Sequence, residues 1–239
     1  MLLAEFRDRT RLICLPEFLS PNPIFEISMN HFANDDTDDR FAVAALSELA
    51  IGGLAIALGW LVGPDARAFV PRWYDLRGIS IGLAAGIFFG VVFVGWMAIL
   101  LRLPLRSIQE LAKLTEGQFL EYLMPMSRLQ LLTLAITAGV GEELLFRGWL
   151  QTALTGPGGL DHSWSRIGFG VLIASIAFGM AHPISRTYVA CAAMMGAMMG
   201  VLYLATQNLL SSIVAHAVYD AIVLISLKRN AERGSRVGL

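Results

Sequence analysis

Two adjacent carboxylates and a guanidinium interrupt an otherwise apolar stretch of the chain, in the segment Gly-Glu-Glu-Leu-Leu-Phe-Arg at 141–147. A charged residue at the centre of a bilayer costs roughly 2.5–3.5 kcal/mol on insertion scales, and such residues usually serve a function. Glu143 and Arg147 are four residues apart, so they share one face of a helix and can form an ion pair. We therefore treat Glu142, Glu143 and Arg147 as candidates for a functional site inside a membrane.

Two further apolar segments carry a pair of residues at the same spacing. Phe178 and His182 occur in Phe-Gly-Met-Ala-His, and His216 and Asp220 occur in His-Ala-Val-Tyr-Asp. Counted at ~1.5 Å per residue from the external loops, these polar residues and Glu142 come at compatible depths, nearer the cytoplasmic half. A lone buried histidine is usually a structural residue, but four such groups at one depth favour a common site.

One glutamate, two histidines and one aspartate around a water molecule suit the hydrolysis of an acyl bond. A carboxylate in a low-dielectric pocket, balanced by a nearby cation or donor, can take a proton from water near neutral pH. Imidazoles beside it can hold that water, donate to a developing oxyanion or bind a metal. Asp220 can fix the tautomer of His216 or join the polarising group, and we expect Arg147 to neutralise Glu143 and keep the pocket in shape.

Other intramembrane hydrolase mechanisms lack their motifs in this chain. There is no His-Glu-x-x-His for a zinc protease and no Gly-x-Ser-x-Gly for a serine nucleophile. Asp220 follows a tyrosine as in one half of an aspartyl protease, but no second membrane aspartate lies in a Gly-x-Gly-Asp context.

The composition indicates an integral membrane protein. Of the 239 residues, 56% are hydrophobic and 15% are charged, and the mean hydropathy is +0.61. Soluble domains carry about 25% charged residues, and several stretches here reach the ~20 apolar residues that cross a bilayer. We predict an all-α, polytopic transmembrane helical bundle surrounded by lipid. The net charge of −1 and the lack of a basic stripe argue against a nucleic-acid partner.

The chain divides into a polar tail at 1–41, a transmembrane domain at 42–227 and a basic tail at 228–239. The first tail contains three prolines and an acidic run, and we expect it to be disordered, or shortened if translation begins at Met29. Segment 104–126 is predicted as an amphipathic interfacial helix or a solvated connector. The six predicted spans are 42–63, 79–101, 128–152, 166–184, 187–205 and 208–227.

Two other features of the spans have more than one interpretation. Glu48 in the first span either reaches a basic loop residue at the cytoplasmic edge or lines the site. Small residues recur every fourth position in two spans, a pattern that lets helices approach closely. These positions are Gly82, Gly86 and Gly90, and Ala192, Gly196 and Gly200.

The three motifs resemble, in order and spacing, those of the CAAX-protease/bacteriocin-processing family (CPBP, or Abi). They are Glu-Glu-x-x-x-Arg at 142–147, Phe-x-x-x-His at 178–182 and His-x-x-x-Asp at 216–220, and the resemblance covers about residues 126–228. It implies a helical membrane fold and an intramembrane endopeptidase. Eukaryotic members of the family remove the last three residues of prenylated CAAX proteins.

The resemblance also implies roles for individual residues. Glu142 would activate the water, His182 would help to position it, and His216 with Asp220 would stabilise the oxyanion. The third motif ends in Asn or Asp, and an ionised aspartate cannot donate. Asp220 therefore acts on the oxyanion only when protonated, or else orients His216. Catalysis by glutamate alone and by a divalent metal such as zinc, held through Glu142, His182 and His216, both remain open.

The expected substrate is a membrane-anchored protein or peptide, cut near its C-terminus or close to the membrane. The compact chain indicates a bacterial inner-membrane protein, for which prenylated CAAX substrates are less expected than other membrane-anchored tails. The alternative function is that of a non-catalytic bacteriocin-immunity or peptide-binding scaffold protein. A transporter would predict inverted repeats between the two halves, and the sequence shows no such internal symmetry.

The distribution of Lys and Arg predicts that both termini face the cytoplasm. Ten basic residues collect on one side of the predicted spans and four on the other. The first set is Arg40, Arg102, Arg106, Lys113, Arg128, Arg186, Lys228, Arg229, Arg233 and Arg236, and the second is Arg67, Arg72, Arg77 and Arg166. A reporter that is active only outside the membrane should therefore stay silent when fused after Leu239. A strong external signal would contradict this orientation.

Overall fold

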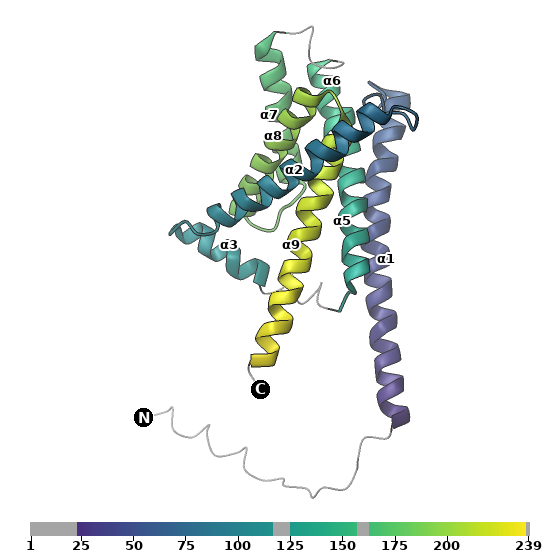
Figure 1. The fold of residues 1–239 in the computed structure, drawn as a ribbon, viewed down its shortest axis with the longest axis vertical. Coiled ribbons are helices and arrows are strands. Elements are labelled where there is room, and N and C mark those ends of the chain that lie inside the picture. Colours follow the sequence, from purple (N-terminus) through teal and green to yellow (C-terminus); the bar gives the residue numbers. More distant parts are fainter. Residues whose placement is uncertain (1–22, 117–124, 157–162, 238–239) are drawn as a thin grey trace, which may run out of the picture. The chain divides into compact units, whose positions relative to one another are not determined.

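A computed structural model of the chain describes residues 23–116, 125–156 and 163–237. All regular elements within these residues are helices (Figure 1), which confirms the predicted fold class. The chain divides into two compact units, Met1–Asp36 and Thr37–Leu239, and the packing described below is that of the second. The helices are α1 (Pro23–Leu61), α2 (Leu76–Leu100), α3 (Arg106–Glu116), α5 (Arg128–Glu143), η1 (Leu144–Gln151), α6 (Thr152–Thr155), α7 (Trp164–Met180), α8 (Arg186–Thr206) and α9 (Leu209–Val237).

Five of the six predicted spans correspond to helices that are long and apolar enough to cross a membrane. The fourth, predicted at 166–184, corresponds to α7, an apolar helix of 17 residues that ends at Met180. The prediction that His182 lies within a span is therefore wrong, since His182 occupies the turn that follows α7. The cause is local: Pro183 comes next, and the residue before a proline is disfavoured in helical conformation.

Other helix boundaries also follow from local sequence. Both of the predicted tails are partly helical. The side chain of Asp75 accepts a hydrogen bond from the Gly78 amide at the start of α2, and Ser127 forms a capping box with Gln130 at the start of α5. α1 begins at Pro23, before the predicted start at residue 42, and α9 continues through the predicted C-terminal tail to Val237. Residues 1–22 of the predicted disordered tail lie outside the described residues.

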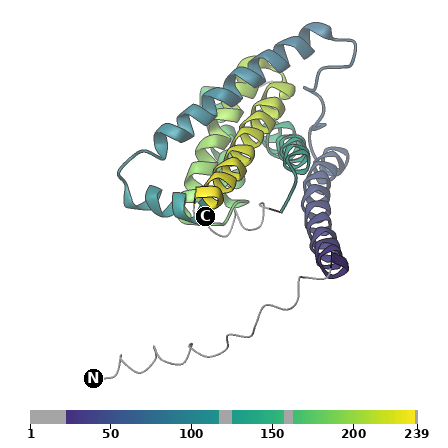
Figure 2. The same ribbon diagram turned by 60° about the horizontal axis from the view of Figure 1, so that its bottom comes forward.

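α9 packs against two helices that are far apart in sequence. It lies between α2 and α5 (Figures 1 and 2), while α7 packs along α8. The glycines of α2 form the first of these contacts. A Cβ atom added at Gly82 would lie 2.9 Å from the Cβ of Leu210, and one added at Gly90 would lie 2.8 Å from the Cβ of Val218. At Gly86 the added atom would overlap Val214, so the doubled small-residue pattern of α2 serves close packing on α9.

The third predicted span is one continuous helical segment with a π-helical middle, η1, between α5 and α6. π-helical turns inside α-helices are rare and often occur at functional sites. Here the turn carries Arg147 and Gln151, and both side chains are buried against α8.

The segment predicted as an interfacial helix or a solvated connector contains the helix α3, for which residues 106–116 are helical and 117–124 lie outside the described part. Its buried residues Ile108 and Leu111 pack against Cys191 of α8. Elsewhere the outer surface of the helices is apolar, as expected for contact with lipid. On α2 the exposed large side chains include Leu83, Ile87, Phe88 and Val91.

We predict that Gly86→Ala destabilises the fold, because the new methyl group would be forced against Val214. Overpacking of this kind costs about 1–3 kcal/mol. Gly95→Ala is the matched control, since no atom comes within 4 Å of a Cβ added there and alanine favours a helix by up to ~1 kcal/mol. Thermal unfolding in detergent measures both variants. Equal melting temperatures for the two would contradict the close contact.

Candidate active site

A fully buried ion pair lies at the centre of the candidate site. Nη1 of Arg147 donates to Oε1 of Glu143 at 2.7 Å, and the two residues are 1% and 0% exposed. Both belong to the third span, one at the end of α5 and the other in η1. The predicted pairing of these two residues is therefore present in the structure. Burial removes both charges from water, so the pair depends on further hydrogen bonds for its stability.

Arg147 supplies those further contacts from its second terminal nitrogen and from its planar face. Nη2 donates to the backbone oxygen of Gly196 in α8 at 3.0 Å. The guanidinium also lies over the ring of Phe178, 4.4 Å from its centroid, which is a favourable cation–π distance. One side chain thus connects η1 with α7 and α8. The glycine at 196 makes room for it, because an added Cβ would lie 3.3 Å from Nη2.

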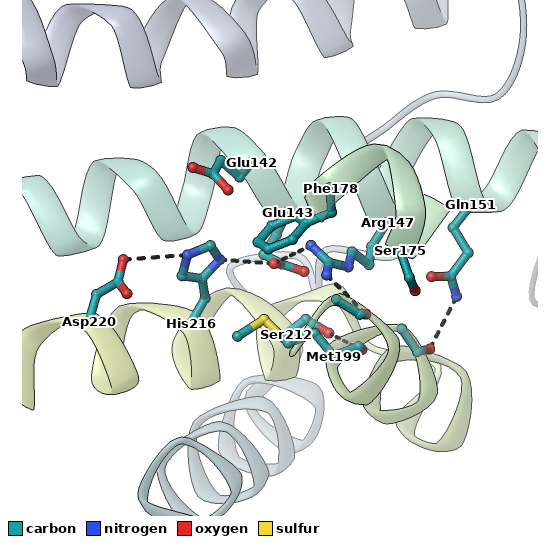
Figure 3. Close-up of polar contacts among 12 residues, drawn as sticks. Glu142, Glu143, Arg147, Gln151, Ser175, Phe178, Met199, Ser212, His216 and Asp220 are labelled. Atoms are coloured by element: carbon teal, nitrogen blue, oxygen red, sulfur yellow. Dashed lines mark hydrogen bonds and ion pairs between the residues drawn. The ribbon is translucent and has the colours of Figure 1, made fainter. Parts of the chain in front are cut away.

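His216 of α9 extends the ion pair into a chain of polar contacts. Its Nδ1 lies 2.9 Å from Oε1 of Glu143, and its Nε2 lies 3.4 Å from Oδ2 of Asp220. Figure 3 shows these residues in sequence from Asp220 through His216 and Glu143 to Arg147. Since a neutral imidazole donates from only one nitrogen, the ring can donate to both carboxylates only as imidazolium. Asp220 is the most accessible member, with 28% of its side chain exposed.

Glu142 and His182 form a second contact beside this chain. Oε2 of Glu142 lies 3.7 Å from Nε2 of His182, and Glu142 is 8% exposed. Nδ1 of His182 is 2.8 Å from the backbone oxygen of Phe178, which can only accept, so this nitrogen carries the hydrogen. In the neutral ring, Nε2 is then a free acceptor that faces the carboxylate. A separation of 3.7 Å is too long for a direct hydrogen bond and suits a bridging water.

Phe178 holds the two groups of polar residues side by side. Its ring centroid lies 4.9 Å from that of His182 and 5.8 Å from that of His216. The structure therefore brings together all of the predicted site residues: Glu142, Glu143, Arg147, Phe178, His182, His216 and Asp220. Glu143 makes one contact that the sequence did not predict, because it lies against His216 as well as Arg147.

Several buried polar residues next to the site were not predicted from the sequence. Nε2 of Gln151 donates to the backbone oxygen of Gly200 at 3.1 Å, one helical turn beyond the contact of Arg147 with Gly196 (Figure 3). Oγ1 of Thr152 donates to the backbone oxygen of Arg147 and lies 3.0 Å from the hydroxyl of Tyr203. The available signal was the four-residue spacing of Arg147 and Gln151, which matches the spacing of the two glycines.

A metal held by the site was one expectation from the sequence. Among the residues whose side chains are described, no group of three or more His, Cys, Asp or Glu side chains could hold a metal ion. The set expected from the sequence, Glu142, His182 and His216, does not form such a group. The described geometry does not fit a metal, and the mechanism below has no step through one.

The fold and these contacts define a class of protein: an integral membrane protein whose helices enclose paired glutamates and histidines. A family model described as "Type II CAAX prenyl endopeptidase Rce1-like" matches residues 124–222. The match covers less than half of the 239 residues, and it confirms the resemblance of the three motifs to the CAAX-protease (CPBP) family. Comparisons with curated proteins and with solved structures gave no match.

We predict that Arg147→Ala lowers stability by about 3–5 kcal/mol, since it leaves the Glu143 carboxylate buried without its counter-charge. Folded protein should be lost before any effect on turnover can be measured. The control is Arg106→Ala in α3, which removes an ion pair with Glu110 at the same four-residue spacing. The side chains of Arg106 and Glu110 are 94% and 67% exposed. That change should cost about 0.5 kcal/mol or less.

Abundance in the membrane and thermal unfolding in detergent compare these two variants. Normal abundance and stability of Arg147→Ala would show that the buried pair is not structural.

Proposed function

We propose that the chain is an intramembrane endopeptidase that hydrolyses a peptide bond of a membrane-associated protein or peptide through a glutamate-activated water. The observation that carries this proposal is the buried contact between Glu142 and His182. The Oε2 atom of Glu142 has no hydrogen-bond partner among the described residues, and it faces a histidine nitrogen at 3.7 Å. A buried acceptor of this kind is costly unless it serves a purpose.

In the proposed mechanism, Glu142 and His182 both accept hydrogen bonds from one water molecule. The water oxygen attacks the scissile carbonyl carbon while Glu142 takes a proton from it. The carbonyl oxygen becomes an oxyanion, and His216 donates to it from Nε2. The carbon–nitrogen bond then breaks, and the proton held by Glu142 passes to the leaving amine.

The contacts of His216 support its assignment to the oxyanion. Glu143 holds its Nδ1 at 2.9 Å, so the hydrogen on Nε2, now 3.4 Å from Asp220, is the one that would be shared with a substrate oxygen. Nε2 faces Asp220, the most accessible residue of the group. In this proposal Asp220 orients the ring of His216 and stabilises its protonated form, and it makes no direct contact with the oxyanion.

The alternative function, a non-catalytic immunity or scaffold protein, needs none of these contacts. A protein that only binds a peptide has no use for a buried glutamate that lacks a partner. The conjunction of Glu142, His182 and His216 therefore favours the enzyme.

The proposed substrate is a membrane-anchored tail, cut near its C-terminus or close to the membrane surface. The family name points to prenylated CAAX proteins. In a bacterial inner membrane, which we propose as the location, other membrane-anchored proteins or peptides are the better candidates. With both termini in the cytoplasm, the site would lie nearer the cytoplasmic half of the bilayer.

We predict that Glu142→Gln lowers turnover at least ~10²-fold with folding intact, because glutamine keeps the size of the side chain but cannot accept a proton. His182→Ala should show the same defect, since both residues would hold one water. The control is Glu110→Gln, which changes an exposed carboxylate of α3. The measurement is a mass-spectrometric comparison of membrane-protein C-termini in cells with the wild-type chain, each variant or no copy.

Two outcomes of this comparison and one further experiment test the peptidase activity, the identity of the base and the need for a metal. If no terminus differs between cells with and without the chain, the peptidase proposal fails. If Glu142→Gln is as active as the wild type, Glu142 is not the base and Glu143 becomes the candidate. Chelation with a full metal analysis decides the remaining question, because activity of metal-free enzyme leaves glutamate alone to activate the water.

A further inference from the structure

The first span contributes a third carboxyl group at the site, that of Glu48. α1 and α5 approach most closely at this point, where a Cβ atom added to Gly141 would overlap the backbone oxygen of Glu48. One turn further along α1, a Cβ atom at Gly52 would lie 3.2 Å from the Cα of Gly141. Since Gly141 directly precedes Glu142, the crossing of the two helices brings Glu48 beside the base of the proposed mechanism.

One oxygen of the Glu48 carboxyl group is buried, although the residue is half-buried and much of α1 around it is exposed. Val43, Leu46 and Leu49 are 51–68% exposed, whereas Oε2 of Glu48 is buried and has no hydrogen-bond partner among the described residues. Its side chain is therefore turned inward. It does not reach toward water at the cytoplasmic edge, which was one of the two interpretations of the sequence.

The charged groups that act on Glu48 are those of the site. Besides its burial, Glu48 is affected by the charges of Glu142, His216, His182 and Asp220. These groups come from α5, the turn after α7, and α9. Glu48 thus lies near the site, and its interaction with Glu142 is repulsive when both carboxylates are ionised.

Two adjacent buried carboxylates are stable only if they share a proton or find another cation. The one buried arginine of the site, Arg147, is bound by Glu143, Gly196 and Phe178. Oε2 of Glu48 and Oε2 of Glu142 are both buried and both without a described partner. A neutral carboxyl group at Glu48 that donates to Glu142 would satisfy both groups at once.

We propose that Glu48 is a positioning residue of this site, which donates a hydrogen bond to the carboxylate of Glu142 and so fixes the orientation of the catalytic base. Oε2 of Glu142 then accepts from Glu48 of α1 and also faces the water and His182, since a carboxylate oxygen can accept more than one hydrogen bond. The effect on catalysis rests on the proposed function. The pairing of the two side chains does not depend on it.

The first test compares Glu48→Ala with Glu48→Gln in the same mass-spectrometric comparison of membrane-protein C-termini, followed over time after expression is induced. Alanine removes the donor, so the rate at which chain-dependent termini appear should fall ~10-fold to ~100-fold, as for a misplaced catalytic group. Glutamine keeps an N–H donor at the same length and should recover most of the lost rate. Ser47→Ala is the matched control on α1, since that hydroxyl donates to the backbone oxygen of Ala44. A wild-type rate in Glu48→Ala, or no recovery in Glu48→Gln, would overturn the proposal.

The second test does not require activity. Thermal unfolding in detergent is measured for Glu48→Ala, Glu142→Ala and the double variant. If the side chains are paired, Glu48→Ala lowers the melting temperature of the wild type more than that of Glu142→Ala. Additive shifts would show that the two groups do not interact. If the wild type cleaves nothing but the shifts are non-additive, the proposed function fails and the pairing stands.

Discussion

The buried ion pair between Glu143 and Arg147 is the interaction on which the arrangement of the site depends. Two charges removed from water are tolerated only when nearly every donor and acceptor is used. The guanidinium meets this condition with a carboxylate, a backbone oxygen of α8 and the face of Phe178. The same carboxylate oxygen, Oε1, also lies 2.9 Å from Nδ1 of His216 in α9, whereas Oε2 of Glu143 is buried with no partner among the described residues. Satisfying one pair of charges thus sets the mutual positions of α7, α8, α9 and the third span.

The glycines of the two small-residue patterns serve this arrangement in different ways. Those of α2 lie against aliphatic side chains of α9 and allow close helix packing. Those of α8, Gly196 and Gly200, lie against the polar ends of Arg147 and Gln151, whose donors reach the backbone oxygens of the same glycines. Without Cβ atoms at these positions, α8 offers acceptors to buried donors deep in an apolar environment, where unpaired polar groups are most costly.

The chemistry is concentrated where regular helix gives way to other backbone conformations. η1 is π-helical, and Pro183 ends the helical segment before His182, which leaves that imidazole in a turn. α9, in contrast, is regular through His216 and Asp220. The site therefore combines side chains of α5, η1 and α9 with one histidine in the turn that follows α7.

The sequence by itself determined the membrane class, the three motifs and the pairs at four-residue spacing, because hydropathy and helical periodicity are local properties. It also contained the caps at Asp75 and Ser127 and the helix stop at Pro183. Only the tertiary structure decided which neighbour each side chain meets. Glu142 and Glu143 point ~100° apart on one helix, and periodicity cannot tell which direction faces His216, His182 or Glu48. That depends on how helices distant in sequence pack together, which here follows from the need to satisfy buried charges.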